Sequence, residues 1–214
     1  MDIKKVVVIG SGTMGSGIAA QVANAGIPVF LLDLPSSEGT RNKIVENAKE
    51  RIANSRPPLL VEKSKIDLIH VGNIEDNFNL VGEADWVVEA VVERIDIKHS
   101  IYKKIEDVRK PESVISSNTS TIPLKVLSEN MSDEMKQNFC ITHFFNPVRY
   151  MGLLEIVTEP INDKEKINLL KSFCDEKLGK GVIICKDTPG FLGNRVGVYA
   201  MQVAMTEAFK MGLT

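Results

Sequence analysis

Several features that assign proteins to special classes are scarce or absent in this sequence. Its 214 residues include only three cysteines, Cys140, Cys174 and Cys185. Their odd number and irregular spacing predict reduced thiols, so we expect no disulfide framework, no metal site and a cytoplasmic location. The formal net charge of -2 and the lack of a basic stripe argue against a nucleic-acid partner. No apolar run is long enough to span a bilayer, and the first five residues lead directly into an apolar strand, so we expect no membrane segment and no signal peptide.

The clearest pattern in the chain is a short apolar strand followed by closely spaced glycines. Residues 6–9 are Val-Val-Val-Ile, typical of a buried parallel strand. Gly10, Gly12 and Gly15 follow with the spacing Gly-x-Gly-x-x-Gly, and a helical run comes next. In such a motif the first glycine permits a tight turn and the second lets backbone N–H groups approach a pyrophosphate. The third lets the helix pack closely on its strand, so the pattern predicts a dinucleotide site.

The second predicted strand, residues 28–33, supports this interpretation because it ends in Asp33. An acid at this distance from the glycines binds the adenine ribose 2′-hydroxyl. Asp33 favours NAD over NADP because a carboxylate would repel a 2′-phosphate, and the next basic residue is Arg41. The alternative is a glycine-rich turn without a ligand. Strand, turn, helix, strand and acid all occur in the required order, which favours the dinucleotide site.

The rest of the chain alternates between strand and helix patterns. We predict a Rossmann-type α/β fold with a doubly wound, mostly parallel sheet. Residues 162–165 have the spacing of a capping box, with Asn162 as the cap of a helix that runs to about residue 178. The other strands are expected at 68–71, 85–93, 113–117, 139–144, 152–158 and 181–185.

The segment 39–66 is a long, charged excursion between the second and third strands, and two prolines interrupt its helical pattern. One interpretation is a cover over the bound ligand, in which basic residues meet an anion. A solvated pair of helices is at least as consistent with the composition. The basic residues concerned are Arg41, Lys43, Lys63 and Lys65.

Polar side chains follow several predicted strands at the edge where a doubly wound sheet binds ligands. Glu93 follows the fourth strand, with Lys98 in the next helix, and small polar groups at 116–120 follow the fifth. Glu155 lies in the middle of an apolar strand, where a carboxylate is unfavourable unless a partner pairs with it. His143, at the end of the neighbouring strand, is the obvious partner. Although a lone histidine is more often structural, this pair beside a nucleotide crevice favours catalysis.

The last helical run, residues 191–211, is apolar around most of its circumference. A helix of this kind expects neighbours on all sides. We therefore predict a nucleotide-binding domain over residues 1–187. Residues 188–214 are predicted to be the first helix of a truncated, all-α C-terminal domain.

Taken together, the motifs resemble the L-3-hydroxyacyl-CoA dehydrogenase family over essentially the whole chain. Some segments look closest to the long multifunctional members, in which a hydratase segment follows on the same polypeptide. The motifs that carry the resemblance are GSGTMGSG (10–17), Asp33, VVEAVVE (87–93), SSNTST (116–121), THFFNP (142–147), LLEIV (153–157) and KDTPGFLGNR (186–195).

The resemblance implies NAD-dependent, reversible oxidation of L-3-hydroxyacyl-CoA to 3-ketoacyl-CoA in fatty-acid β-oxidation. By matching motifs, His143 is the general base and Glu155 orients it and stabilises its protonated form. Ser120 hydrogen-bonds the reacting oxygen, Asn146 positions cofactor and substrate, and Asn194 lies at the substrate. The family also has a helical second domain that forms a homodimer and closes the substrate cleft.

The same resemblance divides the cofactor contacts into two groups. The nicotinamide half is lined by Ala90, Glu93 and Lys98, together with Ser120 and Asn146. The adenosine and pyrophosphate half is held by Gly10, Gly12, Met14, Gly15 and Asp33.

Two other functions use the same scaffold. One is an NAD-binding relative without turnover, which loss of His143, Glu155 or Asn194 would favour, although all three are present. The other is a β-hydroxyacid dehydrogenase with a lysine base, against which THFFNP and LLEIV argue. The chain also departs from the family at Gly152, where many members have lysine.

Overall fold

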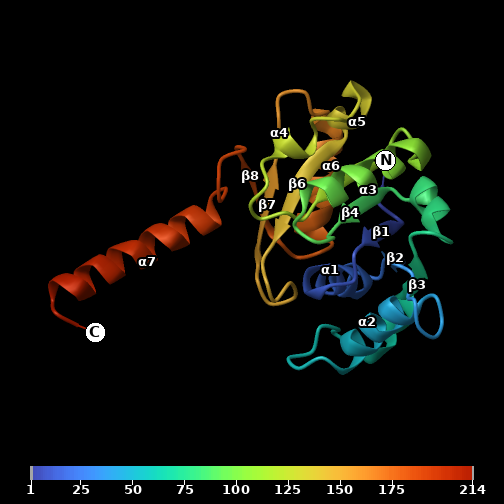
Figure 1. The fold of residues 1–214 in the computed structure, drawn as a ribbon, viewed down its shortest axis with the longest axis horizontal. Helices are drawn as coiled ribbons and strands as arrows, with labels where there is room; N and C mark the ends of the chain where they lie inside the picture. The colour runs from blue at the N-terminus through green and yellow to red at the C-terminus, as the bar shows by residue number, and fades with distance from the viewer. Residues whose placement is uncertain (1, 214) are drawn as a thin grey trace.

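The computed structural model describes residues 2–213 and contains one eight-stranded sheet with helices on both faces (Figure 1). The strands are β1 (Val6–Ile9), β2 (Val29–Asp33), β3 (Ile69–Asn73), β4 (Trp86–Glu89), β5 (Val114–Ser117), β6 (Phe139–Phe144), β7 (Leu153–Val157) and β8 (Gly181–Cys185). The helices are α1 (Thr13–Asn24), α2 (Lys43–Asn54), α3 (Ile95–Val108), α4 (Leu124–Leu127), α5 (Asp133–Gln137), α6 (Lys164–Glu176) and α7 (Gly193–Lys210), with two 3-10 helices, η1 (Lys63–Leu68) and η2 (Phe78–Glu83).

The strand order β3-β2-β1-β4-β5-β6-β7-β8 confirms the predicted Rossmann-type sheet. Every neighbouring pair is parallel except β6 and β7. The order reverses between β1 and β4, and in open α/β sheets ligands bind outside the carboxyl ends of the strands at such a point. The glycine motif follows β1 directly, so the fold places it at this crevice.

The apolar run of β1 is buried on both faces because the sheet is covered on both sides. Side chains alternate between faces along a strand. Val6 and Val8 belong to the apolar cluster that includes residues of α1, α2 and α6. Val7 and Ile9 belong to the cluster on the other face, with residues of α3, α4 and α5. The continuous apolar strand is thus a consequence of double winding.

Asp85 connects the start of β4 to the N-terminal segment. Its Oδ2 accepts the backbone N–H groups of Lys4 and Lys5 at 2.8 and 2.9 Å, and its Oδ1 lies 2.6 Å from Lys110 Nζ. Burial opposes the charge, but Lys110 and the two N–H groups outweigh it and hold the pKa of Asp85 below its ordinary value. A lowered pKa adds stability above the unfolded-state pKa, and this stability is lost as the pH falls through the folded-state value.

We therefore expect Asp85→Asn to lower the free energy of unfolding by about 1–3 kcal/mol at pH 7, the penalty for weakening bonds to a buried charge. The difference from the unsubstituted chain should shrink as the pH falls below about 4, because the wild-type carboxyl is then protonated in the unfolded state. Urea unfolding at neutral pH and at about pH 3 measures both quantities. An equal difference at the two pH values would contradict the electrostatic explanation.

The excursion between β2 and β3 forms α2 and η1, joined by a loop that contains the two prolines. Buried side chains of α2, Val45, Ala48 and Ile52, join the apolar cluster that includes α1. Further along, the predicted capping residue of α6 is wrong by one position. Asp163 is the cap and accepts the N–H groups of Glu165 and Lys166.

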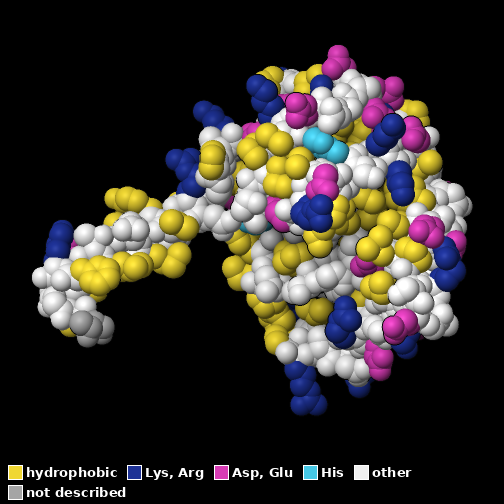
Figure 2. Space-filling view, in the orientation of Figure 1, with side chains coloured by type: hydrophobic (Ala, Val, Ile, Leu, Met, Phe, Trp, Pro, Cys, Tyr) yellow, Lys and Arg dark blue, Asp and Glu magenta, His cyan; other side chains and the backbone are white. Residues whose placement is uncertain are grey.

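Helix α7 extends away from the sheet (Figure 1), and none of its residues is buried. Tyr199 and Phe209 are each 72% exposed, and apolar atoms cover much of the helix surface in Figure 2. The apolar circumference seen in the sequence therefore has no covering layer within residues 2–213. The division at residue 187 stays a prediction. None of the helices in this described range combines the length and hydropathy needed to cross a bilayer.

Candidate active site

The three motif glycines shape a cradle at the carboxyl end of β1. Gly10 has a φ of +102°, and a Cβ there would lie 2.5 Å from the Ala90 carbonyl oxygen. A Cβ on Gly15 would lie 1.8 Å from the Gly10 carbonyl oxygen, so α1 packs on the turn only because this side chain is missing. A Cβ on Gly12 would meet nothing within 4 Å. The open space lies at the N-terminus of α1, where backbone N–H groups favour an anion, so the cradle fits a dinucleotide pyrophosphate.

These contacts predict different outcomes for two alanine substitutions. We expect Gly15→Ala to destabilise the fold by about 3 kcal/mol, because the new Cβ meets fixed backbone. Gly12→Ala should fold normally and weaken NADH binding at least about tenfold, because it blocks close approach of a phosphate to the backbone. Thermal unfolding and NADH fluorescence titration separate the two effects. Equal NADH affinity in Gly12→Ala would remove this glycine from the cofactor site.

Asp33, at the end of β2, is attached to the glycine turn. Its Oδ2 accepts the backbone N–H of Ser11 at 2.6 Å and the Ser11 hydroxyl at 2.5 Å, and its Oδ1 accepts the N–H of Leu34 at 2.7 Å. The acid and the cradle therefore form one rigid unit beside β1. Arg41, the next basic residue, pairs with Glu75 and Asp76 at 2.7 Å each.

A buried ion pair lies at the end of β4 and was not singled out from the sequence. Glu89 is fully buried, and its Oε1 lies 2.7 Å from the Nζ of Lys98, whose side chain is 1% exposed. The other oxygen, Oε2, accepts the hydroxyls of Tyr102 and Ser117 at 2.5 and 2.7 Å. Burial and then the Glu89 charge raise the pKa of Tyr102 well above its ordinary value, which keeps its proton on the shared hydrogen bond.

Lys98 also links Glu89 to Glu93, which opens toward solvent. Its Nζ lies 3.2 Å from the Oε2 of Glu93, whose side chain is 39% exposed. The hydroxyls of Thr119 and Thr121 donate to the other Glu93 oxygen. Burial disfavours the Glu93 charge, but Thr119, Lys98 and Thr121 outweigh it and lower the pKa of Glu93. The structure thus brings the predicted Glu93 and Lys98 together and presents an ionised carboxylate at the crevice.

His143 and Glu155 face each other across the antiparallel pair of β6 and β7. His143 Nδ1 lies 2.7 Å from Glu155 Oε2, and the two side chains are 7% and 0% exposed. The aromatic rings of Phe145 and Phe191 flank the imidazole, with centroids 4.4 and 5.5 Å from it. The pairing expected from the sequence is present, in a dry aromatic pocket.

The second carboxylate oxygen of Glu155 is also occupied. Oε1 accepts the backbone N–H groups of Leu192 and Gly193 at 2.9 and 2.7 Å, and the Cys185 thiol lies 3.7 Å away. Burial disfavours the charge, but His143 and the two N–H groups outweigh it, so the pKa of Glu155 is lower than usual. Glu155 is therefore an ionised partner for the imidazole at neutral pH.

Comparison with known proteins agrees with this geometry. Residues 5–188 match the family model described as 3-hydroxyacyl-CoA dehydrogenase, NAD binding domain. The chain belongs to the 3-hydroxyacyl-CoA dehydrogenase family. This match confirms the family, its oxidoreductase class and NAD as the cofactor that its binding domain takes.

Curated relatives of this dehydrogenase domain are longer than the chain. A "Probable 3-hydroxyacyl-CoA dehydrogenase" of Deinococcus radiodurans is 43% identical over the whole chain, which covers 62% of that protein. A "Putative fatty acid oxidation complex trifunctional enzyme" of Rickettsia felis is 45% identical over 99% of the chain, which covers only 30% of that protein. Among solved structures, FadB2 of M. tuberculosis has a TM-score of 0.80 at 29% identity. That match covers 100% of this chain and 74% of FadB2.

The remaining predicted site residues of the dehydrogenase domain lie around the same edge of the sheet. Ser120 is half-buried in the loop after β5, Asn146 is exposed in the loop after β6, and Met14 is half-buried in α1. Asn194 lies in the first turn of α7, beside a pocket that it lines with Gly190 and Tyr199. The structure records no hydrogen bond that joins the side chains of Ser120, Asn146 or Asn194 to His143 within residues 2–213. Their roles stay predictions.

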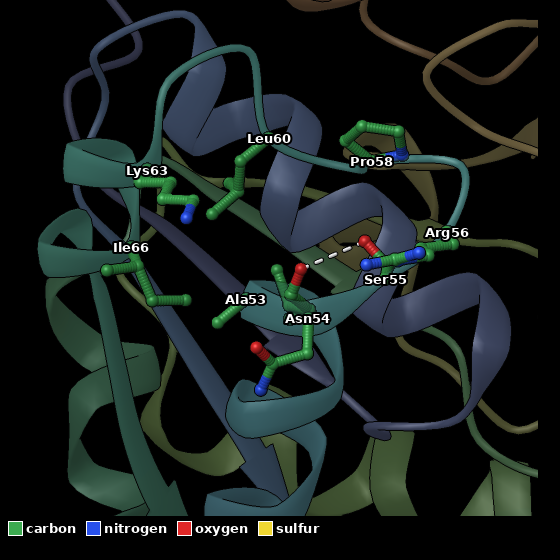
Figure 3. Close-up of a pocket in the computed structure, with 9 residues that line it drawn as sticks. Ala53, Asn54, Ser55, Arg56, Pro58, Leu60, Lys63 and Ile66 are labelled. Atoms are coloured by element: carbon green, nitrogen blue, oxygen red, sulfur yellow. Dashed lines mark hydrogen bonds between the residues drawn. The ribbon is translucent and has the colours of Figure 1, made fainter.

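A separate pocket of about 420 Å³ lies between α2 and η1 in the excursion (Figure 3). Arg56 and Lys63 line it together with apolar residues such as Leu60 and Ile66. It contains neither the glycine cradle nor His143, so it is distinct from the site described above. Of the four basic residues predicted to meet an anion here, Lys63 alone is among its lining residues, while Arg41 pairs with acids.

Proposed function

We propose that this chain is the nucleotide-binding part of an enzyme that oxidises L-3-hydroxyacyl-CoA to 3-ketoacyl-CoA in fatty-acid β-oxidation. The observation that carries the proposal is the buried hydrogen bond between His143 and Glu155 at the sheet edge that also holds the glycine cradle. A base in that place removes the hydroxyl proton while the bound NAD supplies the hydride acceptor. The three buried thiols, none bonded to another, support a reducing, cytoplasmic location.

The geometry assigns each nitrogen of His143 a separate task. Nδ1 donates its proton to the ionised Glu155, which leaves Nε2 unprotonated and able to accept the proton of a 3-hydroxyl group. Once Nε2 is protonated, the Glu155 carboxylate stabilises the imidazolium. Ser120 and Asn146, on the loops after β5 and β6, then orient the reacting oxygen and the cofactor, and Asn194 contacts the substrate from α7.

Glu155→Gln is expected to lower turnover roughly 10-fold to 100-fold, the usual consequence of losing the group that orients a functional histidine. Because the imidazolium then lacks its counter-charge, the acidic limb of the pH–rate profile for alcohol oxidation should move to lower pH. The pKa of Glu155 itself is lowered, so Glu155 is ionised throughout the assay range and its own titration does not produce this limb. A reduced rate with an unshifted limb would leave Glu155 a merely structural role.

The first experiment is acetoacetyl-CoA-dependent oxidation of NADH, measured beside His143→Gln. Activity that is lost in the variant supports the reaction, the cofactor and the base together. A chain that binds NADH and turns over neither acetoacetyl-CoA nor longer 3-ketoacyl-CoA, even when extended to the length of the Deinococcus relative, is a binding protein on this fold. Oxidation of 3-hydroxyisobutyrate instead would favour the β-hydroxyacid alternative.

We further propose that residues 188–214 begin a helical domain that completes the substrate cleft and forms a homodimer. The exposed apolar surface of α7 supports this assignment, since large exposed apolar patches mark interaction surfaces. Sedimentation of the chain and of an extended chain tests it. A monomeric extended protein would contradict the homodimer.

A further inference from the structure

Phe191, just before α7, has a backbone conformation that non-glycine residues rarely adopt. Its φ is 46°, and within residues 2–213 it is the only non-glycine residue with a positive φ. Its side chain is 3% exposed, so packing surrounds it. Residues held in left-handed backbone persist where neighbouring contacts fix them, and they concentrate at functional sites.

The consequence of this turn lies in the next two residues. After Phe191, the backbone N–H groups of Leu192 and Gly193 both donate to Oε1 of Glu155, at 2.9 and 2.7 Å. Gly193 fits closely here, because a Cβ on it would lie 2.9 Å from the Phe145 ring. With Oε1 fixed by the backbone, Oε2 faces His143 Nδ1 at 2.7 Å. A single turn of the chain therefore sets the orientation of the carboxylate.

The groups that contact Glu155 show why the backbone is needed for this task. The titratable side chains in contact with it are His143 from β6 and Cys185 from β8. Burial and then the Glu155 charge raise the pKa of Cys185 to about 11, so this thiol is neutral and donates only a weak hydrogen bond. Apart from the imidazole, the two N–H groups are thus the strong donors to Glu155 in residues 2–213.

We infer that Phe191 is a positioning residue for the base. Its left-handed backbone aims two N–H groups that orient Glu155, and its ring packs against the imidazole with centroids 5.5 Å apart. Through Glu155, this arrangement directs Nε2 of His143 toward the substrate oxygen. The inference rests on the proposed role of His143 as the base and adds a residue that acts on it without touching the substrate.

Two substitutions separate the backbone effect from the ring. Phe191→Ala and Phe191→Gly both remove the ring, but glycine adopts the left-handed conformation without penalty, whereas alanine does not. We expect turnover in the acetoacetyl-CoA assay to be roughly 5-fold to 30-fold lower in Phe191→Ala than in Phe191→Gly, the population cost of left-handed backbone for an L-residue. Equal turnover in the two variants would overturn the inference.

A second readout does not depend on activity. The Nδ1 proton of His143, bonded to Glu155, gives a downfield NMR resonance that is assigned by its loss in His143→Gln. We expect Phe191→Gly to keep this resonance and Phe191→Ala to shift or broaden it, while thermal unfolding shows that both variants fold. An unchanged resonance in Phe191→Ala would overturn the inference even if turnover fell. An active His143→Gln would instead overturn the proposed function and leave the NMR result on Phe191 standing.

Discussion

His143→Gln is expected to reduce turnover by roughly 100-fold to 10,000-fold, the range that general acid–base catalysis contributes. Glutamine fills much of the same space and its amide N–H can still donate to Glu155, so the buried carboxylate keeps a donor. What it lacks is a basic nitrogen in the place of Nε2. The loss should therefore appear in the rate of the chemical step, measured by NADH oxidation with acetoacetyl-CoA.

The control for His143→Gln is cofactor binding. The glycine cradle and Asp33 lie on β1, α1 and β2, outside the β6–β7 hairpin that carries His143. NADH affinity, followed by fluorescence titration, should stay close to that of the unsubstituted chain. Undiminished turnover would remove His143 from the mechanism. Loss of both binding and turnover would indicate that the variant is misfolded, which thermal unfolding detects.

Glu89→Ala should produce the largest loss of stability among the substitutions considered. Glu89 accepts from Lys98, Tyr102, Ser117 and the backbone N–H of Val91, and all four donors would be left without it. Breaking a buried ion pair by removing one partner costs about 3–5 kcal/mol. Since whole domains are stable by only about 5–15 kcal/mol, we expect a large drop in the urea midpoint.

Two comparisons separate the ion pair from the loss of side-chain volume. Glu93→Ala removes a carboxylate from the same lysine, but this side chain is 39% exposed, so we expect its effect on unfolding to stay within about 1 kcal/mol. Glu89→Ala should also cost less in a Lys98→Met background, where no buried charge is left unpaired. The same cost in both backgrounds would show that the pair contributes little and that the hydroxyl and packing contacts dominate.

The sequence predicted the fold well where each residue obeys a strong local constraint. Continuous apolar strands specify a sheet buried on both faces, and Gly10 and Gly15 occupy positions that tolerate no side chain. The pairing of His143 with Glu155 was also predictable, because a carboxylate within an apolar strand needs a partner on the adjoining strand. The same argument applies to Glu89, which follows three apolar residues of β4. Applied there, it would have identified the ion pair with Lys98.

Other features depend on contacts between distant segments that no local pattern reveals. Asn162 has the composition of a helix cap, yet its side chain bonds the backbone of Lys136, Phe139 and Glu159, and Asp163 caps α6 instead. The excursion was ambiguous because a charged segment has few apolar positions to fix its packing. The left-handed turn at Phe191 was unpredictable because residue types that favour positive φ are glycine and asparagine, not phenylalanine.

The antiparallel pairing of β6 and β7 separates chemistry from nucleotide recognition along the chain. The proposed base and its partner lie within one hairpin, thirteen residues from His143 through Glu155, while the glycine cradle and the Glu93–Lys98 pair end before α3 does. Substitutions in the hairpin can therefore abolish the reaction and leave the nucleotide scaffold intact. A lineage that lost the imidazole would keep a ready-made NADH receptor, and an engineer could convert this domain into a cofactor sensor by the same single exchange.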